Sequence, residues 1–122
     1  HAGTAMMSPA NGVRVYLALG ATDMRKSIDG LSILVSRQLQ LDPFAGHLFG
    51  FCNRSRTIIK LLYWDRNGFC LWHKRLERHV FRWPTREAEV LAIDSRQLAW
   101  LLDGLDPLAV TGHSRLEYST LF

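Results

Sequence analysis

The chain contains little cysteine, little proline and no long apolar run. Its 122 residues include two cysteines and four prolines, and no apolar segment approaches the ~20 residues that cross a bilayer. Cys52 and Cys70 both stand among apolar residues, where a free thiol behaves as a small hydrophobic group. These absences argue against a disulfide scaffold and a membrane protein, and they predict a reduced, cytoplasmic protein.

Motifs of catalysis and cofactor binding are absent as well. The sequence has no glycine-rich nucleotide loop, no serine nucleophile elbow and no zinc-ligand spacing of histidine and cysteine. Asp23, Asp65 and Glu77 could converge on metal ions as in a nuclease, but a helix cap, a turn and a counter-charge explain them separately. We therefore expect no cofactor, no metal and no enzymatic activity, and a metal-dependent nuclease is kept as an alternative.

The length and composition indicate one globular domain. The apolar fraction of 48% and the charged fraction of 21% are typical of such domains, and a chain of this length can bury one core. Residues 1–7 are interpreted as a tag remnant or a disordered start. Residues 8–106 form the predicted domain. Residues 107–122 have no clear periodicity and are expected to be a tail for partner contact, disorder or vector-derived sequence.

The first half of the chain predicts a strand, a helix and another strand. Residues 13–18 have strand character, and Thr22 or Asp23 would cap the helix that follows. The apolar positions of this helix recur at helical spacing: they are Met24, Ile28, Leu31, Leu34, Val35 and Leu39. The Asp-Pro pair at residues 42–43 would end the helix, and the next strand is expected over residues 47–53.

Asn67 and Gly68 predict a tight hairpin, because both residues accept the positive φ angles of a type I′ turn. The turn would join strands over residues 57–65 and 69–75. The predicted cross-strand pairs are Arg66 with Phe69, Trp64 with Leu71, Leu62 with His73 and Lys60 with Arg75. The opposite face would carry Ile59, Leu61, Tyr63, Trp72 and Lys74. A slip by one residue is the alternative register.

The last part of the domain predicts short elements. Residues 80–83 are expected to be a short strand or an extended piece, and residues 90–93 another strand. Asp94 and Ser95 cap a second helix that Gly104 closes, with Leu98, Leu101 and Leu102 facing inward. Together these elements predict an α+β fold, in which a small, mostly antiparallel sheet packs against one main helix and a second short helix lies near the C-terminus.

Positive charge is concentrated in residues 54–86. This segment has nine Lys and Arg residues against Asp65 and Glu77, so its net charge is 9 − 2 = +7, whereas the remaining residues have six against nine, or −3. Clustered cations displace the counterions condensed on a phosphate backbone, so the asymmetry favours a nucleic-acid partner. A solubilising basic face is the alternative.

Eight cations of this segment are candidate DNA contacts: Arg54, Arg56, Lys60, Arg66, Lys74, Arg75, Arg78 and Arg82. Arg25 and Lys26 are secondary candidates, because they are expected in the first turn of the first helix, where anions bind. Six aromatic residues accompany the basic segment, and they could stack on unpaired bases or fill the core. They are Tyr63, Trp64, Phe69, Trp72, Phe81 and Trp83.

Several runs of the sequence are shared with one family. They are GATDMRKSIDGL at residues 20–31, then residues 42–49, 60–65, 67–72 and 74–77, then Phe81, Trp83 and Pro84, and finally residues 101–106. These runs resemble the TnpB-type proteins of bacterial insertion sequence sixty-six, the second open reading frame products of those elements. The chain departs from the family at Ser27 and Arg66, where glycine is usual, and at residues 79–80 (His-Val), where Gly-Arg is usual.

The resemblance implies an accessory, non-catalytic factor required for transposition. Such elements resemble a three-gene set, in which a larger product carries the acidic catalytic triad. We therefore expect DNA and the other products of the element, including the transposase, as partners, and a second copy of the chain as a further potential partner. DNA binding through the basic hairpin is the first hypothesis. An adaptor that docks on the transposase or on itself, without DNA contact, is the alternative.

Overall fold

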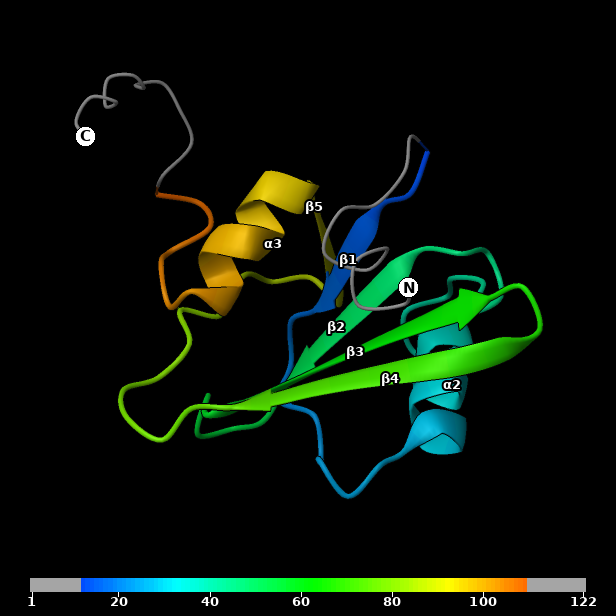
Figure 1. Cartoon of the computed structure of the whole chain (residues 1–122), viewed down its shortest axis with the longest axis horizontal. Coiled ribbons are helices and arrows are strands. Elements are labelled where there is room, and N and C mark those ends of the chain that lie inside the picture. The colour runs from blue at the N-terminus through cyan, green and yellow to red at the C-terminus, as the bar shows by residue number, and fades with distance from the viewer. Residues whose placement is uncertain (1–11, 110–122) are drawn as a thin grey trace.

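A five-stranded sheet with one helix on each face makes up the part of the chain that the structure describes (Figure 1). The computed structural model describes residues 12–109, and the expectations for residues 1–7 and for most of the 107–122 tail lie outside that range. The elements in chain order are β1 (Val15–Ala18), α2 (Ile28–Arg37), β2 (Leu48–Cys52), β3 (Ile58–Asp65), β4 (Gly68–Arg75), β5 (Val90–Ile93) and α3 (Ser95–Leu102).

The strands lie in the order β4-β3-β2-β1-β5. β1 and β2 are parallel, since α2 connects them, and the other three pairings are antiparallel. This arrangement confirms the predicted α+β fold with a mostly antiparallel sheet. Residues 80–83 form neither strand nor helix within the described part of the chain.

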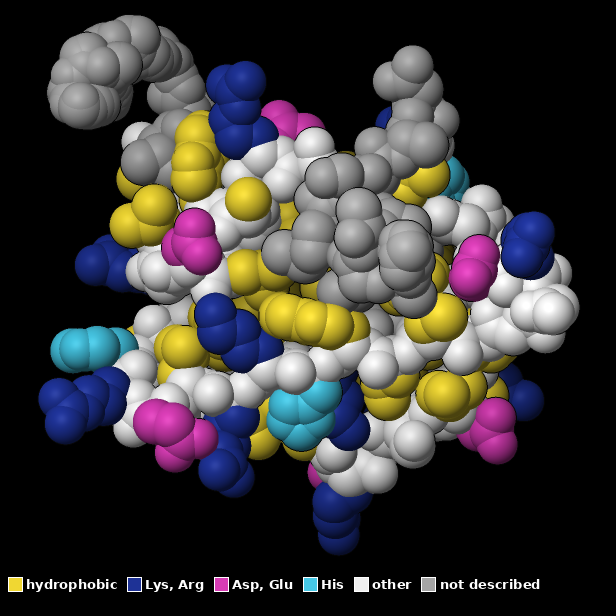
Figure 2. Space-filling view, viewed as in Figure 1, with side chains coloured by type: hydrophobic (Ala, Val, Ile, Leu, Met, Phe, Trp, Pro, Cys, Tyr) yellow, Lys and Arg dark blue, Asp and Glu magenta, His cyan; other side chains and the backbone are white. Residues whose placement is uncertain are grey.

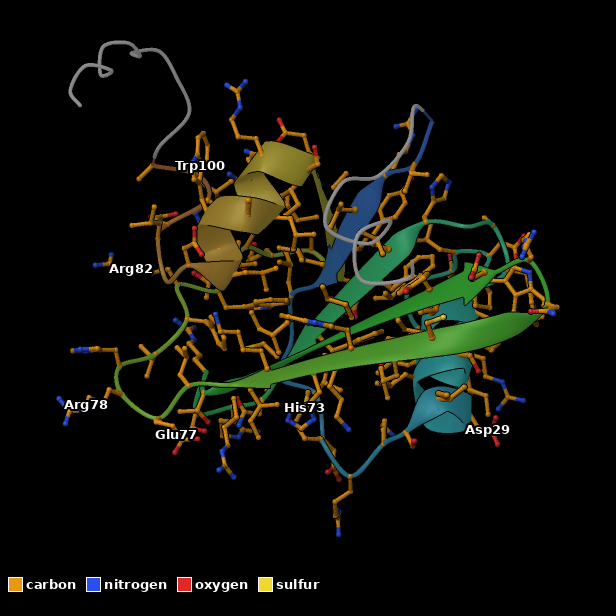
Figure 3. The ribbon with its side chains drawn as sticks, in the orientation of Figure 1. Asp29, His73, Glu77, Arg78, Arg82 and Trp100 are labelled. Carbon is orange, nitrogen blue, oxygen red and sulfur yellow. The ribbon has the colours of Figure 1, made fainter. Side chains whose placement is uncertain are left out.

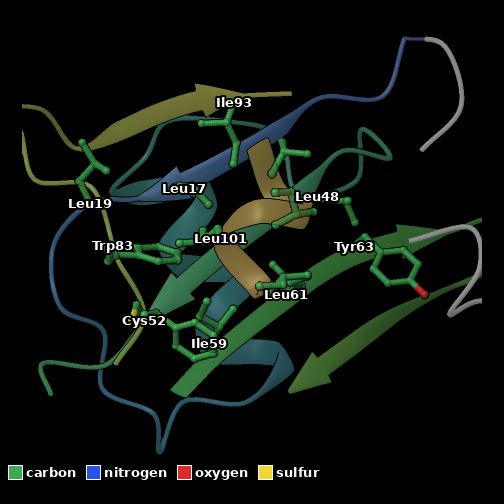
Figure 4. Close-up of a cluster of buried hydrophobic side chains, with 14 residues drawn as sticks. Leu17, Leu19, Leu48, Cys52, Ile59, Leu61, Tyr63, Trp83, Ile93 and Leu101 are labelled. Atoms are coloured by element: carbon green, nitrogen blue, oxygen red, sulfur yellow. The ribbon is translucent and has the colours of Figure 1, made fainter. Parts of the chain in front are cut away.

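The sheet has an apolar core on each face, because successive side chains of a strand point to opposite sides. Behind the sheet of Figure 1, α2 packs through Leu31 and Val35 on Phe49, Phe51 and Leu62. On the other face, α3 and the segment around Trp83 cover the second core, which Figure 4 shows. That core includes Leu17, Leu48, Ile59, Leu61, Phe81, Trp83, Leu98 and Leu101.

The hairpin register differs from the predicted one by two residues. Asp65 pairs with Gly68, and the positive φ angle falls on Arg66, at 52°. The predicted pairing of Lys60 with Arg75 is therefore wrong: the actual partners are His73 for Lys60 and Ile58 for Arg75. A shift of two keeps every side chain on its predicted face. It also aligns apolar residues across the strands, as in Leu62 with Leu71, Leu61 with Trp72 and Trp64 with Phe69.

The first helix begins later than predicted. Its first residue is Ile28 and its N-cap is Ser27, whose side chain makes no capping hydrogen bond. Asp23 lies before the helix and instead accepts hydrogen bonds from Arg25. The predicted cap at Thr22 or Asp23 is therefore wrong, and so is the placement of Arg25 and Lys26 in the first helical turn.

The second helix agrees with the prediction. Asp94 is its N-cap: the carboxylate accepts from the Gln97 N–H at 2.7 Å, and the Gln97 side chain accepts from the Asp94 N–H at 2.9 Å. This reciprocal pair satisfies two backbone donors that the helix start would leave unpaired. Gly104 follows the helix with a φ of 87°, a left-handed conformation that glycine adopts at low cost.

Candidate nucleic-acid interface

Three connecting segments meet at one end of the sheet. β1, β2 and β4 end there and β3 begins there, because β3 runs opposite to both its neighbours. The segments are residues 19–27, 53–57 and 75–82, and we call this region the basic end. In Figure 1 it surrounds the point where the arrow of β4 finishes, at the lower left.

Backbone hydrogen bonds tie the three segments together. The Thr22 N–H donates to the Cys52 carbonyl, which joins the first segment to the end of β2, at 2.8 Å. The Phe81 N–H donates to the Arg56 carbonyl, also at 2.8 Å. A third bond of the same length runs from the Leu76 N–H to the Thr57 carbonyl. The basic end is therefore one connected structure.

Asn53 shapes the loop between β2 and β3. Its side-chain oxygen accepts from the N–H groups of Thr57 and Ile58, at 2.9 and 3.0 Å, and its amide donates to the hydroxyls of Ser55 and Thr57. An asparagine that bonds nearby backbone in this way holds a tight turn. The turn leaves the Arg54 and Arg56 side chains exposed to solvent.

The exposed charge of the basic end is mostly positive. Its charged residues are Arg25, Lys26, Arg54, Arg56, Arg75, Arg78 and Arg82 against Asp23 and Glu77, and 7 − 2 = +5. All nine are exposed. Figure 3 shows Arg78 and Arg82 projecting from the connection after β4, with Glu77 near Arg78. Figure 2 shows Lys and Arg side chains along the same rim. The next residues, 83–89, add Arg86, Glu87 and Glu89.

Carboxylates pair with two of these cations. The Arg25 guanidinium lies 2.7 Å from the Asp23 carboxylate, and Arg75 lies 3.1 Å from Glu77. Hydrogen bonds from the Arg25 side chain and backbone lower the pKa of Asp23 to about 2. Within residues 12–109 no other ion pair forms. Lys26, Arg54, Arg56, Arg78 and Arg82 therefore keep their charge available to a partner.

Three of the candidate DNA contacts lie elsewhere. Lys60 is buried, and its ammonium donates to the carbonyls of Met24 and Lys26, at 2.9 and 3.0 Å. The Lys74 ammonium donates to the Leu102 carbonyl at the C-terminus of α3, at 2.9 Å, where a cation is favourable. Arg66 is exposed in the turn at the opposite end of the hairpin. The cations therefore gather around loops, and the hairpin face itself does not present them together.

The aromatic residues divide between the core and a separate cluster. Tyr63, Phe81 and Trp83 are buried. Trp64 and Phe69 contact each other and Phe44, with ring centroids 5.0 to 5.2 Å apart, near the β3–β4 turn. These rings therefore form no exposed platform beside the cations of the basic end.

A hollow of about 160 Å³ opens within the basic end. Its lining comes from the first two segments, from the end of β2 and from Trp83, which directly follows the third segment: Leu19, Gly20, Ala21, Cys52, Asn53, Arg54, Arg56 and Trp83. Sequence reasoning missed the hollow, because no local motif records that these residues meet. The one usable signal was the pair of arginines in a short loop.

Other kinds of site find no support in the part of the chain that the structure describes. No group of three or more His, Cys, Asp and Glu side chains there is placed to hold a metal ion. No helix among those residues is long and apolar enough to span a membrane.

Comparison with known proteins identifies the family. The IS66 Orf2 like protein family matches residues 13–111. The uncharacterized protein y4hO of Sinorhizobium fredii is 42% identical over 101 residues, which cover 83% of this chain and 88% of that protein. The uncharacterized protein y4jC of the same organism is 32% identical over 101 residues, covering 83% and 86%. No solved structure matches. The chain therefore belongs to the IS66 Orf2-like family, whose members are accessory proteins of insertion-sequence transposition.

Proposed function

We propose that this accessory protein binds DNA through the basic end and thereby takes part in assembling the transposition complex. The supporting observation is the set of five exposed cations that have no carboxylate partner within residues 12–109: Lys26, Arg54, Arg56, Arg78 and Arg82. They come from three segments that hydrogen bonds hold together. Fixed cations bind phosphates with little ordering cost, because the backbone that carries them is already in place.

The arginines of the basic end suit a DNA backbone. A guanidinium can donate two parallel hydrogen bonds to one phosphate. Each phosphate that is neutralised releases counterions, so the logarithm of the binding constant falls with the logarithm of salt concentration by about 0.9 per contact. Contacts of this kind position a protein on DNA without specifying a sequence.

The test is a salt titration of DNA binding. Fluorescence anisotropy would give the affinity of the wild-type protein for a labelled duplex at several salt concentrations. The triple variant Arg54→Gln, Arg56→Gln, Arg78→Gln should flatten the logarithmic slope by about 3. The matched variant with lysine at the same three positions should keep the wild-type slope. Binding that does not depend on salt, or equal slopes for the glutamine and wild-type proteins, would contradict the proposal.

An adaptor role remains the second candidate, and the sheet edges favour it. β4 is an edge strand of eight residues, so one side of its backbone pairs with no other strand of residues 12–109. An extended segment of the transposase, or β4 of a second copy, could pair there. A pull-down with the transposase in the presence of nuclease separates the candidates. A complex that survives nuclease, from a protein that does not shift DNA, would favour the adaptor.

A further inference from the structure

We infer that the hollow in the basic end seats one unpaired nucleotide, with its phosphate against Arg54 and Arg56. The inference rests on the proposed DNA binding and adds to it a preference for single-stranded or frayed DNA. It concerns the hollow lined by Gly20, Asn53 and Trp83 together with the two arginines.

The size of the hollow limits its occupant. A volume of about 160 Å³ is below the roughly 300 Å³ at which pockets begin to bury drug-sized ligands. A base pair cannot enter it, whereas part of one nucleotide can. A phosphate of an intact duplex could touch the arginines at the rim and leave the hollow empty. Entry therefore requires a nucleotide that is not held in a base pair.

The lining supplies donors for a phosphate. Arg54 and Arg56, two exposed residues of one short loop, line the hollow, so their guanidinium groups can reach a phosphate bound there. Along the facing segment, the N–H groups of Leu19 and Thr22 donate to the carbonyls of Glu89 and Cys52. Gly20 and Ala21 lie between those two residues, and their N–H groups have no hydrogen-bond partner within the described chain. Backbone N–H groups and arginines are the two kinds of donor that most often contact phosphates.

The rest of the lining is neutral and fixed. The Trp83 indole N–H donates to the Ala18 carbonyl at 3.0 Å, so the ring is held in place as a wall. Burial raises the pKa of the Cys52 thiol to about 12, so this wall carries no negative charge at neutral pH. No Asp or Glu lines the hollow. A neutral wall beside two cations admits an anion together with a flat, partly apolar group.

Gly20 allows the hollow to be filled without strain. A Cβ built there meets no atom within 4 Å, and its φ lies outside the left-handed region. Gly20→Leu should therefore fold and occupy the space. Gly68→Leu is the matched control, because a Cβ at Gly68 also meets no atom within 4 Å and Gly68 lies at the opposite end of the hairpin.

The experiment compares a labelled single-stranded oligonucleotide with a blunt duplex of the same sequence. Gly20→Leu should weaken single-strand binding by about tenfold, a typical loss for one nucleotide contact, and leave duplex binding within about twofold of wild type. Gly68→Leu should change neither affinity. If Gly20→Leu leaves both affinities unchanged, or weakens both equally, the hollow does not select an unpaired nucleotide. If wild type binds neither DNA, the proposed function itself is wrong.

A second measurement uses the wild-type protein and does not depend on a variant folding. In ¹H–¹⁵N NMR spectra, a trinucleotide should shift the amide signals of Gly20, Ala21 and Asn53 at concentrations where inorganic phosphate does not. Equal shifts with inorganic phosphate would reduce the site to one for a free anion and overturn the nucleotide assignment. An absence of shifts at these three amides would overturn it as well.

Discussion

Lysines of the hairpin strands stabilise the molecule from within. Lys60 bridges two carbonyls of residues 24–26, and Lys74 bonds the end of α3. An ammonium has three donors on a flexible stem, so it can satisfy carbonyls that no backbone N–H reaches. A lysine in a strand therefore need not expose its charge on the surface, because its ammonium can be used inside the fold.

Replacing Lys60 should reduce stability. In Lys60→Met the apolar stem is kept, but two carbonyls of the 24–26 turn lose their donor, at a cost of about 2–3 kcal/mol in the free energy of unfolding. Urea denaturation measures this loss. Lys26→Met is the control: Lys26 is exposed, so its loss should change stability by less than about 0.5 kcal/mol. A Lys60 variant as stable as that control would show that the two bonds contribute nothing.

Buried acidic groups should make the fold sensitive to alkali. Burial raises the pKa of Cys52 from 9.0 to about 12, and burial and a hydrogen bond with Cys70 raise that of Tyr63 from 10.0 to about 12. In the unfolded chain both groups lose their protons near pH 9 to 10. Their contribution to stability is thus complete below pH 9 and is lost as the pH rises toward 12.

The measurement is urea denaturation at about pH 8 and about pH 10.5, a pair of conditions that brackets the onset of ionisation. Wild type should lose stability between them. The double variant Cys52→Ala, Tyr63→Phe should lose less, although it starts from a lower value. Equal losses in the two proteins would assign the alkaline effect to other groups.

At the scale of elements, the hairpin turn carries a strained residue. Arg66 has a φ of 52°, and a residue with a Cβ pays roughly 1–2 kcal/mol for this conformation. Arg66→Gly should remove that cost. Glycine also raises the conformational entropy of the unfolded chain, which offsets part of the gain, so the expected net stabilisation is about 0.5–1 kcal/mol. Thermal denaturation checks it. Arg66→Ala removes the same charge but keeps the Cβ, so a gain in that variant would point to charge instead of strain.

A side chain in the middle of β2 would force its neighbours in the core to shift. A Cβ at Gly50 would lie 2.8 Å from Leu17 Cδ2 and 3.2 Å from Leu61 Cδ2, inside the core under α3. Gly50→Ala should therefore destabilise the protein by about 1–3 kcal/mol, as overpacking does. Gly20→Ala meets nothing within 4 Å and should be neutral in the same denaturation experiment. Similar stabilities for the two variants would mean that the core adjusts freely.

The elements themselves could largely be predicted from sequence. Strand alternation, the cap at Asp94 and Ser95 and the closing Gly104 are local signals, and they located the strands and α3 well. Two details required tertiary information. The hairpin register follows from apolar pairing across β3 and β4, which outweighed the turn preference of Asn67 and Gly68. The late start of α2 accompanies tertiary hydrogen bonds that a local pattern cannot show: the Lys60 ammonium donates to the carbonyls of Met24 and Lys26, and the Thr22 N–H donates to the Cys52 carbonyl.

At the scale of the whole molecule, the basic end arises only through the fold. The sequence indicated the excess of positive charge in residues 54–86. It could not show that residues 19–27 lie beside the exposed cations of that segment, or that Lys60, Lys74 and Arg66 lie elsewhere in the fold. The meeting of three segments at one end depends on the strand order. A sheet of another order would place the same residues apart.

The most direct measurement compares two double variants that each remove two arginine charges. Arg54→Gln, Arg56→Gln lies in the basic end, and Arg14→Gln, Arg66→Gln lies at the opposite end of the sheet, where β1 begins and β3 meets β4. At moderate salt the first variant should weaken binding to a labelled duplex by about tenfold or more and flatten the salt slope by about 2, and the second should remain close to wild type. Equal losses in the two variants would show that only net charge attracts DNA, and would contradict a binding surface at the basic end.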